Sequence, residues 1–336
     1  MPQRIALELQ ALVAETRRKY PDVRQSAEHL LAQWQADADR TVSELQSCKD
    51  PSSHALLQMI VLACETRSPK VIQLALSLLQ SSIPLRILPD TSLATVIDTL
   101  HTLLSAPGRT DVDVQLKILQ IVSSLLVTYA NVTSELLSRA LMLCFTLYEH
   151  SRVVVVSSTA AAMLRQNVMV VFEKVHGEDQ SFDAIQNEDA AVNAPLPVGT
   201  AELPSGLVTL FPCAADVYHL LNDLCALADG QPAHFLPLDT LSKPFVLELL
   251  ESVLTTQSSL FQRHPELVYI LRSAACPFLL KALSKPPASF SVYIRVMRLV
   301  ALLLCEYHKE IVLEVEMLLR ALLDTLDEKH ALWQRV

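Results

Sequence analysis

The sequence predicts an all-α protein, an armadillo/HEAT-like, right-handed α-solenoid of roughly a dozen helices. The first observation that predicts it is the scarcity of glycine. Five glycines in 336 residues are too few for the tight hairpins of an all-β fold or the phosphate-binding turns of an α/β fold. The second is that apolar residues recur at helical spacing from end to end. The third is that prolines fall at the ends of these periodic segments, where a missing N–H costs little.

Apolar stripes mark the individual helices. Residues 23–34 place Val, Ala, Leu, Leu and Trp at i, i+4, i+7, i+8 and i+11, which is one face of an amphipathic helix. Residues 246–253 and 311–322 repeat the pattern with charged side chains on the opposite face. Residues 116–127 are apolar over more than half of the circumference, as expected for a helix between two neighbours. Helix pairs recur at about 40 residues, the period of armadillo and HEAT units.

Prolines indicate where helices begin or are interrupted. Three of them lie beside a side chain that can cap a helix; they are found in Asp50-Pro51, in Ser68-Pro69 and in Lys243-Pro244, which Ser242 precedes. Pro277 lies inside the apolar run 273–283, so we expect a kink or a break there. The β-branched run 153–156 could form a strand on propensity alone, but the Ala-rich sequence after it favours a helix.

One segment, residues 177–208, interrupts the helical pattern. It is acidic, contains three of the five glycines and has little apolar periodicity. We therefore expect a flexible acidic linker at 177–208 between two helical blocks, residues 1–176 and residues 209–336. The chain stops directly after a helical segment, so we expect it to be the N-terminal part of a longer protein.

Composition restricts the partners and the compartment. A net charge of −9 disfavours nucleic acid as a partner, because nucleic-acid binding requires a basic surface. The seven cysteines are scattered, mostly inside apolar helical runs, without CxxC or zinc-type spacing, which indicates a reducing, cytoplasmic compartment. The longest fully apolar stretch, residues 299–305, is far shorter than the roughly 18 residues of a membrane span. Acidic residues interrupt the segment that a signal peptide would occupy.

The sequence contains no recognisable catalytic, cofactor-binding or metal site, so we expect no cofactor and no enzyme. Glycines at P-loop or dinucleotide-binding spacing are absent, as are HExxH and GxSxG. His308 stands near two glutamates, but residues at such spacing face different directions on a helix, which favours a solvated surface. Cys213, His219 and Cys225 are better explained by a helix with a buried and an exposed face than by metal binding.

A basic cluster stands out on this acidic chain. Arg17, Arg18, Lys19 and Arg24 place four positive charges within eight residues, around the helix break at Tyr20-Pro21. Two interpretations remain open. The cluster is either a solvated helix end, where cations favour the helix C-terminus, or a surface for acidic lipid headgroups or an acidic partner.

Several segments, in order along the chain, resemble one family. Residues 210–227 (LFPCAADVYHLLNDLCAL) and 241–254 (LSKPFVLELLESVL) resemble the start of the HUS region of the large Sec-seven-type Arf guanine nucleotide exchange factors and of their non-catalytic relative, the Mon-two family. Three upstream segments resemble the dimerisation and cyclophilin-binding (DCB) region of that family: RRKYPDVRQSAE (17–28), SPKVIQLALSLLQ (68–80) and SSTAAAMLRQNVMVVFEKV (157–175). Residues 293–304 and 315–327 continue the likeness, which covers almost the whole chain.

The resemblance implies an armadillo-like superhelix in which a DCB-like block (1–176) and the N-terminal part of a HUS-like block (209–336) pack end to end. It also implies a non-enzymatic scaffold and regulatory region in trans-Golgi and endosomal vesicle trafficking. Such a protein is cytoplasmic and peripherally associated with the trans-Golgi network and endosomes. The implied partners are a Dopey-family protein, an Arf or Arf-like small GTPase, a second copy of the chain, and an anionic membrane surface.

Two other functions stay open beside this resemblance. The catalytic exchange domain of Arf exchange factors is not in this sequence, and neither is the Asn-Tyr-Asp-Cys-type box that ends their HUS region. One alternative is that the chain is the autoregulatory N-terminal region of a catalytic large Arf exchange factor. The other is a transport adaptor of karyopherin type, which would bind peptide signals.

Tyr218, Asn222 and Asp223 are candidate residues of the DCB–HUS junction. Asn222 and Asp223 are polar residues on a segment otherwise rich in Leu and Ala. They are either part of the structure of their own block, or they pair with polar groups across the junction. If they are buried they must be hydrogen-bonded.

Overall fold

The computed structural model describes residues 2–36, 51–105, 111–187, 196–204, 206–285 and 289–325. Helices make up most of these residues, and one antiparallel two-stranded hairpin completes the regular structure within them. The chain folds as two compact units, Met1–Asn167 and Val168–Val336. The predicted all-α class is confirmed.

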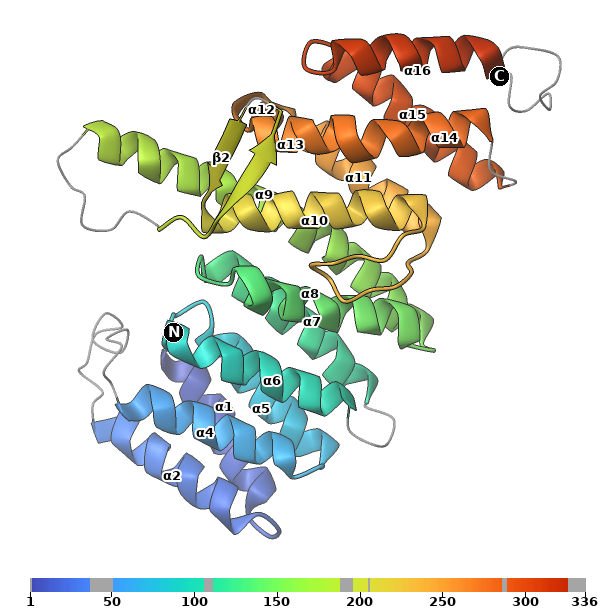
Figure 1. Cartoon of the computed structure of the whole chain (residues 1–336). Coiled ribbons are helices and arrows are strands. Elements are labelled where there is room, and N and C mark those ends of the chain that lie inside the picture. The colour runs from blue at the N-terminus through green and yellow to red at the C-terminus, as the bar shows by residue number, and fades with distance from the viewer. Residues whose placement is uncertain are drawn as a thin grey trace. The chain divides into compact units, whose positions relative to one another are not determined.

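Two layers of helices build the first unit. Its elements are α1 (Pro2–Thr16), α2 (Pro21–Ala36), α4 (Pro51–Glu65), α5 (Pro69–Ser82), a 3₁₀ turn (Asp90–Ser92), α6 (Leu93–Ser105), α7 (Val112–Thr128), α8 (Ser134–His150) and the first part of α9 (Val154–Asn187). Helices α2, α4, α6 and α8 form one layer, and α1, α5 and α7 form the other (Figure 1). This alternation between two layers is the arrangement of an α-solenoid. The right-handed twist stays a prediction.

Prolines begin helices where the sequence predicts it. Helix α4 begins at Pro51 and α5 at Pro69, and Pro244 lies in the first turn of α11 (Lys243–Thr256). The hydroxyls of Ser68 and Ser242 make no capping hydrogen bond. Their backbone carbonyls instead accept the first helical bonds, from the amides four residues ahead at 2.9 and 3.0 Å. These starts therefore depend on the fixed φ of proline more than on a side-chain cap.

Buried apolar stripes hold the layers of the first unit together. Helix α7 lies against both α5 and α8, and its buried side chains cover more than one face, as residues 116–127 predict. They are Val114, Ile118, Leu119, Ile121, Val122, Ser123, Leu125 and Leu126. Burying one Leu or Ile side chain contributes about 1.5–3 kcal/mol, so the core of this unit comes mainly from helices with two packed faces.

The second unit repeats the two-layer arrangement. Besides the last part of α9, its helices are α10 (Pro212–Asp229), α11, α12 (Ser258–Arg263), α13 (Pro265–Ile270), α14 (Cys276–Ser284), α15 (Phe290–Glu306) and α16 (Val312–Thr325). One layer contains α10, α13–α14 and α16, and the other contains α11 and α15 (Figure 1). Arg295 of α15 and Glu248 of α11 form an ion pair of 3.0 Å within the second layer.

The irregularity expected near Pro277 is a π-helical turn. It occupies Leu271–Ala275, between α13 and α14, and Pro277 lies in the first turn of α14. Proline cannot donate to the carbonyl one turn before it. The helix widens just before Pro277, where the amide of Cys276 donates to the carbonyl of Leu271, five residues earlier. The chain therefore absorbs the missing bond in a widened turn instead of a complete break.

The described part of 177–208 differs from the flexible linker that the sequence predicts. Helix α9 continues to Asn187, and β1 (Gly199–Leu203) pairs antiparallel with β2 (Gly206–Leu210). Tertiary contacts explain the order. The Phe182 ring packs on Phe211 with centroids 4.1 Å apart, and Ala201 and Leu210 of the hairpin are buried against α10. The domain boundaries at 176 and 208 stay predictions.

Two helical segments in the described ranges, Val154–Asp183 and Pro265–Ser284, are long and apolar enough to cross a membrane by length and composition alone. The core helix of a soluble protein passes the same test, so the result is weak evidence for a span. In the fold, these segments contribute fully buried side chains such as Leu164, Phe172 and Leu271.

Candidate functional site

The predicted basic cluster lies in the turn that joins α1 to α2. Arg17, Arg18 and Lys19 are exposed there, and Arg24 is partly buried in the first turns of α2. A guanidinium nitrogen (Nη1) of Arg24 donates to the carbonyl of Arg17 at 3.4 Å, and its Nε lies 3.5 Å from Glu28. Arg24 therefore helps to shape the turn, while the other three cations point to solvent.

A second basic turn adjoins the first. The hydroxyl of Tyr20 donates to the carbonyl of Thr66 at 3.3 Å, which brings the α4–α5 turn beside the α1–α2 turn. Arg67 and Lys70, just beyond Thr66, are exposed. We call the combined surface the basic edge; it consists of Arg17, Arg18, Lys19, Arg24, Arg67 and Lys70.

The basic edge carries a modest positive surplus. Six cations stand against four nearby exposed carboxylates, those of Glu15, Asp22, Glu28 and Glu65. Sequence reasoning missed Arg67 and Lys70 because the contact that joins the turns spans 46 residues. The sequence contained one signal of this contact, Tyr20 next to the helix-breaking Pro21. A buried tyrosine ring usually directs its hydroxyl to a hydrogen-bond partner.

A polar cluster surrounds the end of α9 within the second unit. The Glu178 carboxylate accepts hydrogen bonds from the amides of Cys213 and Ala214, each at 3.1 Å. These are the second and third residues of α10, so a side chain from another helix performs the role of an N-cap. Burial raises the pKa of Glu178, while the two amide hydrogen bonds favour its carboxylate form.

His264, between α12 and α13, bridges two carboxylates. Its Nδ1 lies 2.7 Å from Glu266 and its Nε2 lies 3.2 Å from Asp179 on α9. The side chain of His264 is 13% exposed and that of Glu266 is 3% exposed. Arg263 adds an ion pair of 3.0 Å to Asp183, one turn further along α9.

One more contact belongs to this group of polar side chains around the end of α9. His176 Nε2 lies 3.1 Å from Gln257 Oε1 at the end of α11. We call the whole set the junction cluster; its side chains are His176, Glu178, Asp179, Asp183, Gln257, Arg263, His264 and Glu266. The cluster attaches the last turns of α9 to α10, α11, α12 and α13, and it can hold or release a proton at His264.

The three residues predicted from the sequence to lie at the junction are all on α10, and none of them is among the side chains of the junction cluster. Asp223 is 1% exposed and accepts hydrogen bonds from the amides of His234 and Leu236 at 2.8 and 2.6 Å. These partners belong to the loop that follows α10, so Asp223 organises its own unit instead of pairing across a junction. Its burial with full hydrogen bonding is what a buried carboxylate requires.

Tyr218 and Asn222 are partly buried on α10. Tyr218 packs against the hairpin residues Ala201 and Leu210, and burial, together with Tyr269 and Glu266, raises its pKa. A direct junction role for Tyr218 and Asn222 stays a prediction.

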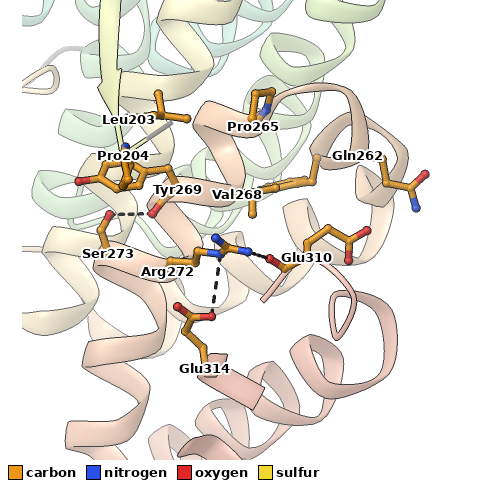
Figure 2. A pocket seen from close by; sticks show the side chains of 11 residues that line it. Leu203, Pro204, Gln262, Pro265, Val268, Tyr269, Arg272, Ser273, Glu310 and Glu314 are labelled. Carbon is orange, nitrogen blue, oxygen red and sulfur yellow. Dashed lines mark hydrogen bonds and ion pairs between the residues drawn. The ribbon is translucent and has the colours of Figure 1, made fainter. Parts of the chain in front are cut away.

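The second unit also contains a groove of about 550 Å³ between the hairpin tip, α12, α13, the π-helical turn and the start of α16 (Figure 2). Its apolar lining comes from Leu203, Pro204, Phe261, Pro265 and Val268. Arg272 donates to the carbonyl of Glu310, and its Nε lies 3.9 Å from Glu314 (Figure 2). Arg272 thus connects the π-helical turn to the start of α16, through the backbone of Glu310 and the side chain of Glu314, whereas the Oε2 atom of Glu310 is buried without a hydrogen-bond partner among the described residues.

The groups considered for metal binding take structural positions. Burial raises the pKa of the Cys213 and Cys225 thiols to about 12, so both are protonated near neutral pH and are poor metal ligands. His308 is exposed and its Nδ1 lies 3.1 Å from the carbonyl of Cys305. Among the described residues, no group of three His, Cys, Asp or Glu side chains could hold a metal ion.

Two family models match the chain on either side of the hairpin. Residues 2–179 match the DCB model, described as Mon2/Sec7/BIG1-like, dimerisation and cyclophilin-binding domain. Residues 213–336 match the Mon2/Sec7/BIG1-like HUS domain. The chain belongs to the Mon2/Sec7/BIG1-like family. The resemblance predicted from the sequence segments is confirmed.

Relatives of this family align with nearly the entire chain. The Protein MON2 homolog of Homo sapiens is 31% identical over 346 residues, which cover 98% of this chain and 19% of the human protein. The Protein MON2 homolog of Drosophila melanogaster is 28% identical, with 98% of this chain and 20% of the fly protein covered. Protein MON2 of Saccharomyces cerevisiae is 25% identical, with 100% and 20% covered. The chain spans about a fifth of the length of these curated relatives.

The family matches identify what the junction cluster joins. His176, Glu178 and Asp179 lie within the DCB match, and Gln257, Arg263, His264 and Glu266 lie within the HUS match, whereas Asp183 lies in neither. The cluster is therefore a DCB–HUS contact inside the second unit. The HUS domain is not a catalytic domain, and membership in the Mon2/Sec7/BIG1-like family supports a Sec7-like trafficking scaffold.

Proposed function

We propose that the chain is a non-enzymatic scaffold and regulatory region in trans-Golgi and endosomal vesicle trafficking. The observation that carries the proposal is the pair of DCB and HUS matches over residues 2–179 and 213–336. Helices with exposed faces are suited to binding other proteins. In this proposal the protein is cytoplasmic and attaches peripherally to trans-Golgi and endosomal membranes.

The proposed partners are proteins and a membrane surface. Self-association is supported by the description of DCB as a dimerisation domain. An Arf or Arf-like small GTPase and a Dopey-family protein are the protein partners that we propose beyond it. The basic edge, with six cations from two adjacent turns, supports weak contact with anionic lipid headgroups.

Proximity labelling in cultured cells tests the function. The full chain carries the labelling enzyme, and the enzyme alone is the control. The expected result is enrichment of trans-Golgi and endosomal proteins, with Arf-like GTPases or a Dopey-type protein among them. A labelled set without Golgi or endosomal enrichment would contradict the proposal.

An alternative function is the autoregulatory region of a catalytic large Arf exchange factor. The observation that favours it is the family description, which groups Mon2 with Sec7 and BIG1. A nucleotide-exchange assay with the endogenous full-length protein separates the two functions. Accelerated GDP release from an Arf protein supports the alternative, and a rate equal to the spontaneous one supports the non-enzymatic scaffold.

A further inference from the structure

The junction cluster depends on one side chain that can change its charge near neutral pH. His264 places both ring nitrogens within hydrogen-bond distance of carboxylates, Glu266 at 2.7 Å and Asp179 at 3.2 Å. A carboxylate can only accept a hydrogen bond, so satisfying both contacts requires a proton on each nitrogen. The geometry therefore matches the imidazolium ion.

Neutral His264 cannot make both contacts. It carries one N–H, and its other nitrogen would present a lone pair to a carboxylate oxygen. Glu266 is almost fully buried, and a buried carboxylate that loses its donor is destabilised by the cost of leaving water. Loss of the proton therefore weakens either the contact of His264 with Glu266 or its contact with Asp179 on α9.

The charges around His264 favour its protonated form. From α9 the cluster receives Asp179 and Asp183, with Glu178 beside them; α12 contributes Arg263, and α13 contributes Glu266. Burial, together with Tyr269 of α13 and Glu266, raises the pKa of Tyr218 of α10, so Tyr218 is uncharged around pH 7. Three carboxylates thus surround one arginine and one histidine, since Glu178 is bound to the amides of α10.

We propose that His264 is a protonation-dependent latch that holds the end of the DCB segment against the HUS segment. The latch joins Asp179 on α9 to Glu266 on α13 while His264 is charged. It releases the end of α9 when His264 loses its proton. In this way a single side chain makes the DCB–HUS contact inside the second unit sensitive to pH.

The direction of the pH effect follows from the surroundings of His264. Burial alone lowers the pKa of His264, but the hydrogen bonds and charges of Glu266 and then Asp179 outweigh burial and raise the pKa above its ordinary 6.5. A group with a raised pKa stabilises the folded state fully below its ordinary pKa. That stabilisation is lost as the pH rises through the raised pKa, so the latch weakens on the alkaline side.

Two measurements on the wild-type chain test the latch. An NMR titration of the His264 ring should give a midpoint above 6.5. Native-state hydrogen exchange, corrected for the intrinsic rate at each pH, should show lower protection of α9 residues 176–183 at pH 8.5 than at pH 6.0. Each unit by which the pKa is raised corresponds to roughly a tenfold loss of protection. A midpoint at or below 6.5, or equal protection at both pH values, overturns the proposal.

Two variants separate the latch from general packing. His264→Gln keeps a hydrogen-bonding side chain that does not titrate, so the pH-dependent part of the protection at 176–183 should disappear. His176→Gln is the matched control, because it removes a histidine of the same cluster whose partner is the uncharged Gln257, and it should keep the wild-type pH dependence. If His264→Gln retains that dependence, or if His176→Gln abolishes it, the latch is not His264. Should His264→Gln fail to fold, the wild-type titration alone decides.

Discussion

Asp223 shows how burial determines the role of a single polar side chain. Its carboxylate accepts two backbone hydrogen bonds from the loop after α10 and is 1% exposed. The loop amides have this acceptor in place of a strand or helix partner. Asp223 therefore holds the loop after α10 at His234 and Leu236.

Replacing Asp223 should destabilise the second unit. Asp223→Ala leaves the amides of His234 and Leu236 without their acceptor, at a cost of about 2–5 kcal/mol for two hydrogen bonds to a charged group. Urea unfolding, combined with hydrogen exchange of the loop amides, measures the loss. Asn222→Ala on the same helix is the control, because its side chain is only partly buried, and it should cost less than 1 kcal/mol. Equal stability of the two variants would show that the loop does not depend on Asp223.

The hairpin β1–β2 is the element that departs most from what the local sequence predicts, which is a flexible linker. Its strands lie largely in the segment 177–208, which is acidic, contains three glycines and has little apolar periodicity. Gly206 begins β2 with φ at +131°, a conformation that residues with a Cβ rarely adopt. The hairpin therefore needs glycine at this position, although no side chain stands in the way of a Cβ there.

Gly206→Ala should loosen the hairpin without disturbing the helices. The strain of a side chain at this φ costs on the order of 1–3 kcal/mol, which is large for a hairpin of two five-residue strands. Amide exchange of 199–210 measures the effect. Gly199→Ala is the matched control, since its φ is not positive and nothing lies within 4 Å of an added Cβ. Similar exchange in both variants would contradict a backbone requirement at Gly206.

Helices, their proline starts and the apolar faces of α7 were predictable because local spacing determines them. The π-helical turn was predictable as an irregularity, since Pro277 lies inside an apolar run. The junction cluster was not predictable. His264 and Asp179 are 85 residues apart in the sequence. Neither residue has neighbours in the sequence that distinguish it from an ordinary exposed polar residue. Asp223 looked like a junction residue for the same reason, because sequence does not reveal which acceptor a distant amide will use.

For the whole molecule, the family domains and the compact units have different boundaries. The DCB match ends at residue 179, whereas the second unit begins at Val168. Residues 168–179 therefore belong to the DCB domain by the family match, but they lie in the same compact unit as the HUS helices. A regulatory signal at this contact acts within one compact unit.

The proposed membrane attachment through the basic edge is tested at the scale of the whole molecule. Arg17→Glu with Arg18→Glu should weaken binding to anionic vesicles, and so should Arg67→Glu with Lys70→Glu, because each cation near an anionic surface contributes roughly 1 kcal/mol. We expect a loss of tenfold or more in a flotation assay at low salt, and a smaller loss at high salt.

A matched control separates position from net charge. Lys309→Glu with Arg320→Glu makes the same charge change on exposed residues of the second unit and should bind as the wild type does. Equal weakening by all three pairs would show that total charge, and not the basic edge, governs attachment. Unchanged flotation of the first two pairs would rule out the basic edge.

The π-helical turn at Leu271–Ala275 constrains how this chain can change in length during evolution. A π-helical turn contains one residue more than an α-helical turn for about the same rotation of the chain. Deleting one residue there would therefore leave Phe278 and Leu279, now buried, close to the side of the helix that faces the core. Pro277 opposes such a deletion, because in a continuous α-helix its ring clashes with the carbonyl four residues before it. A one-residue deletion in this turn is therefore compatible with the packing only together with replacement of Pro277.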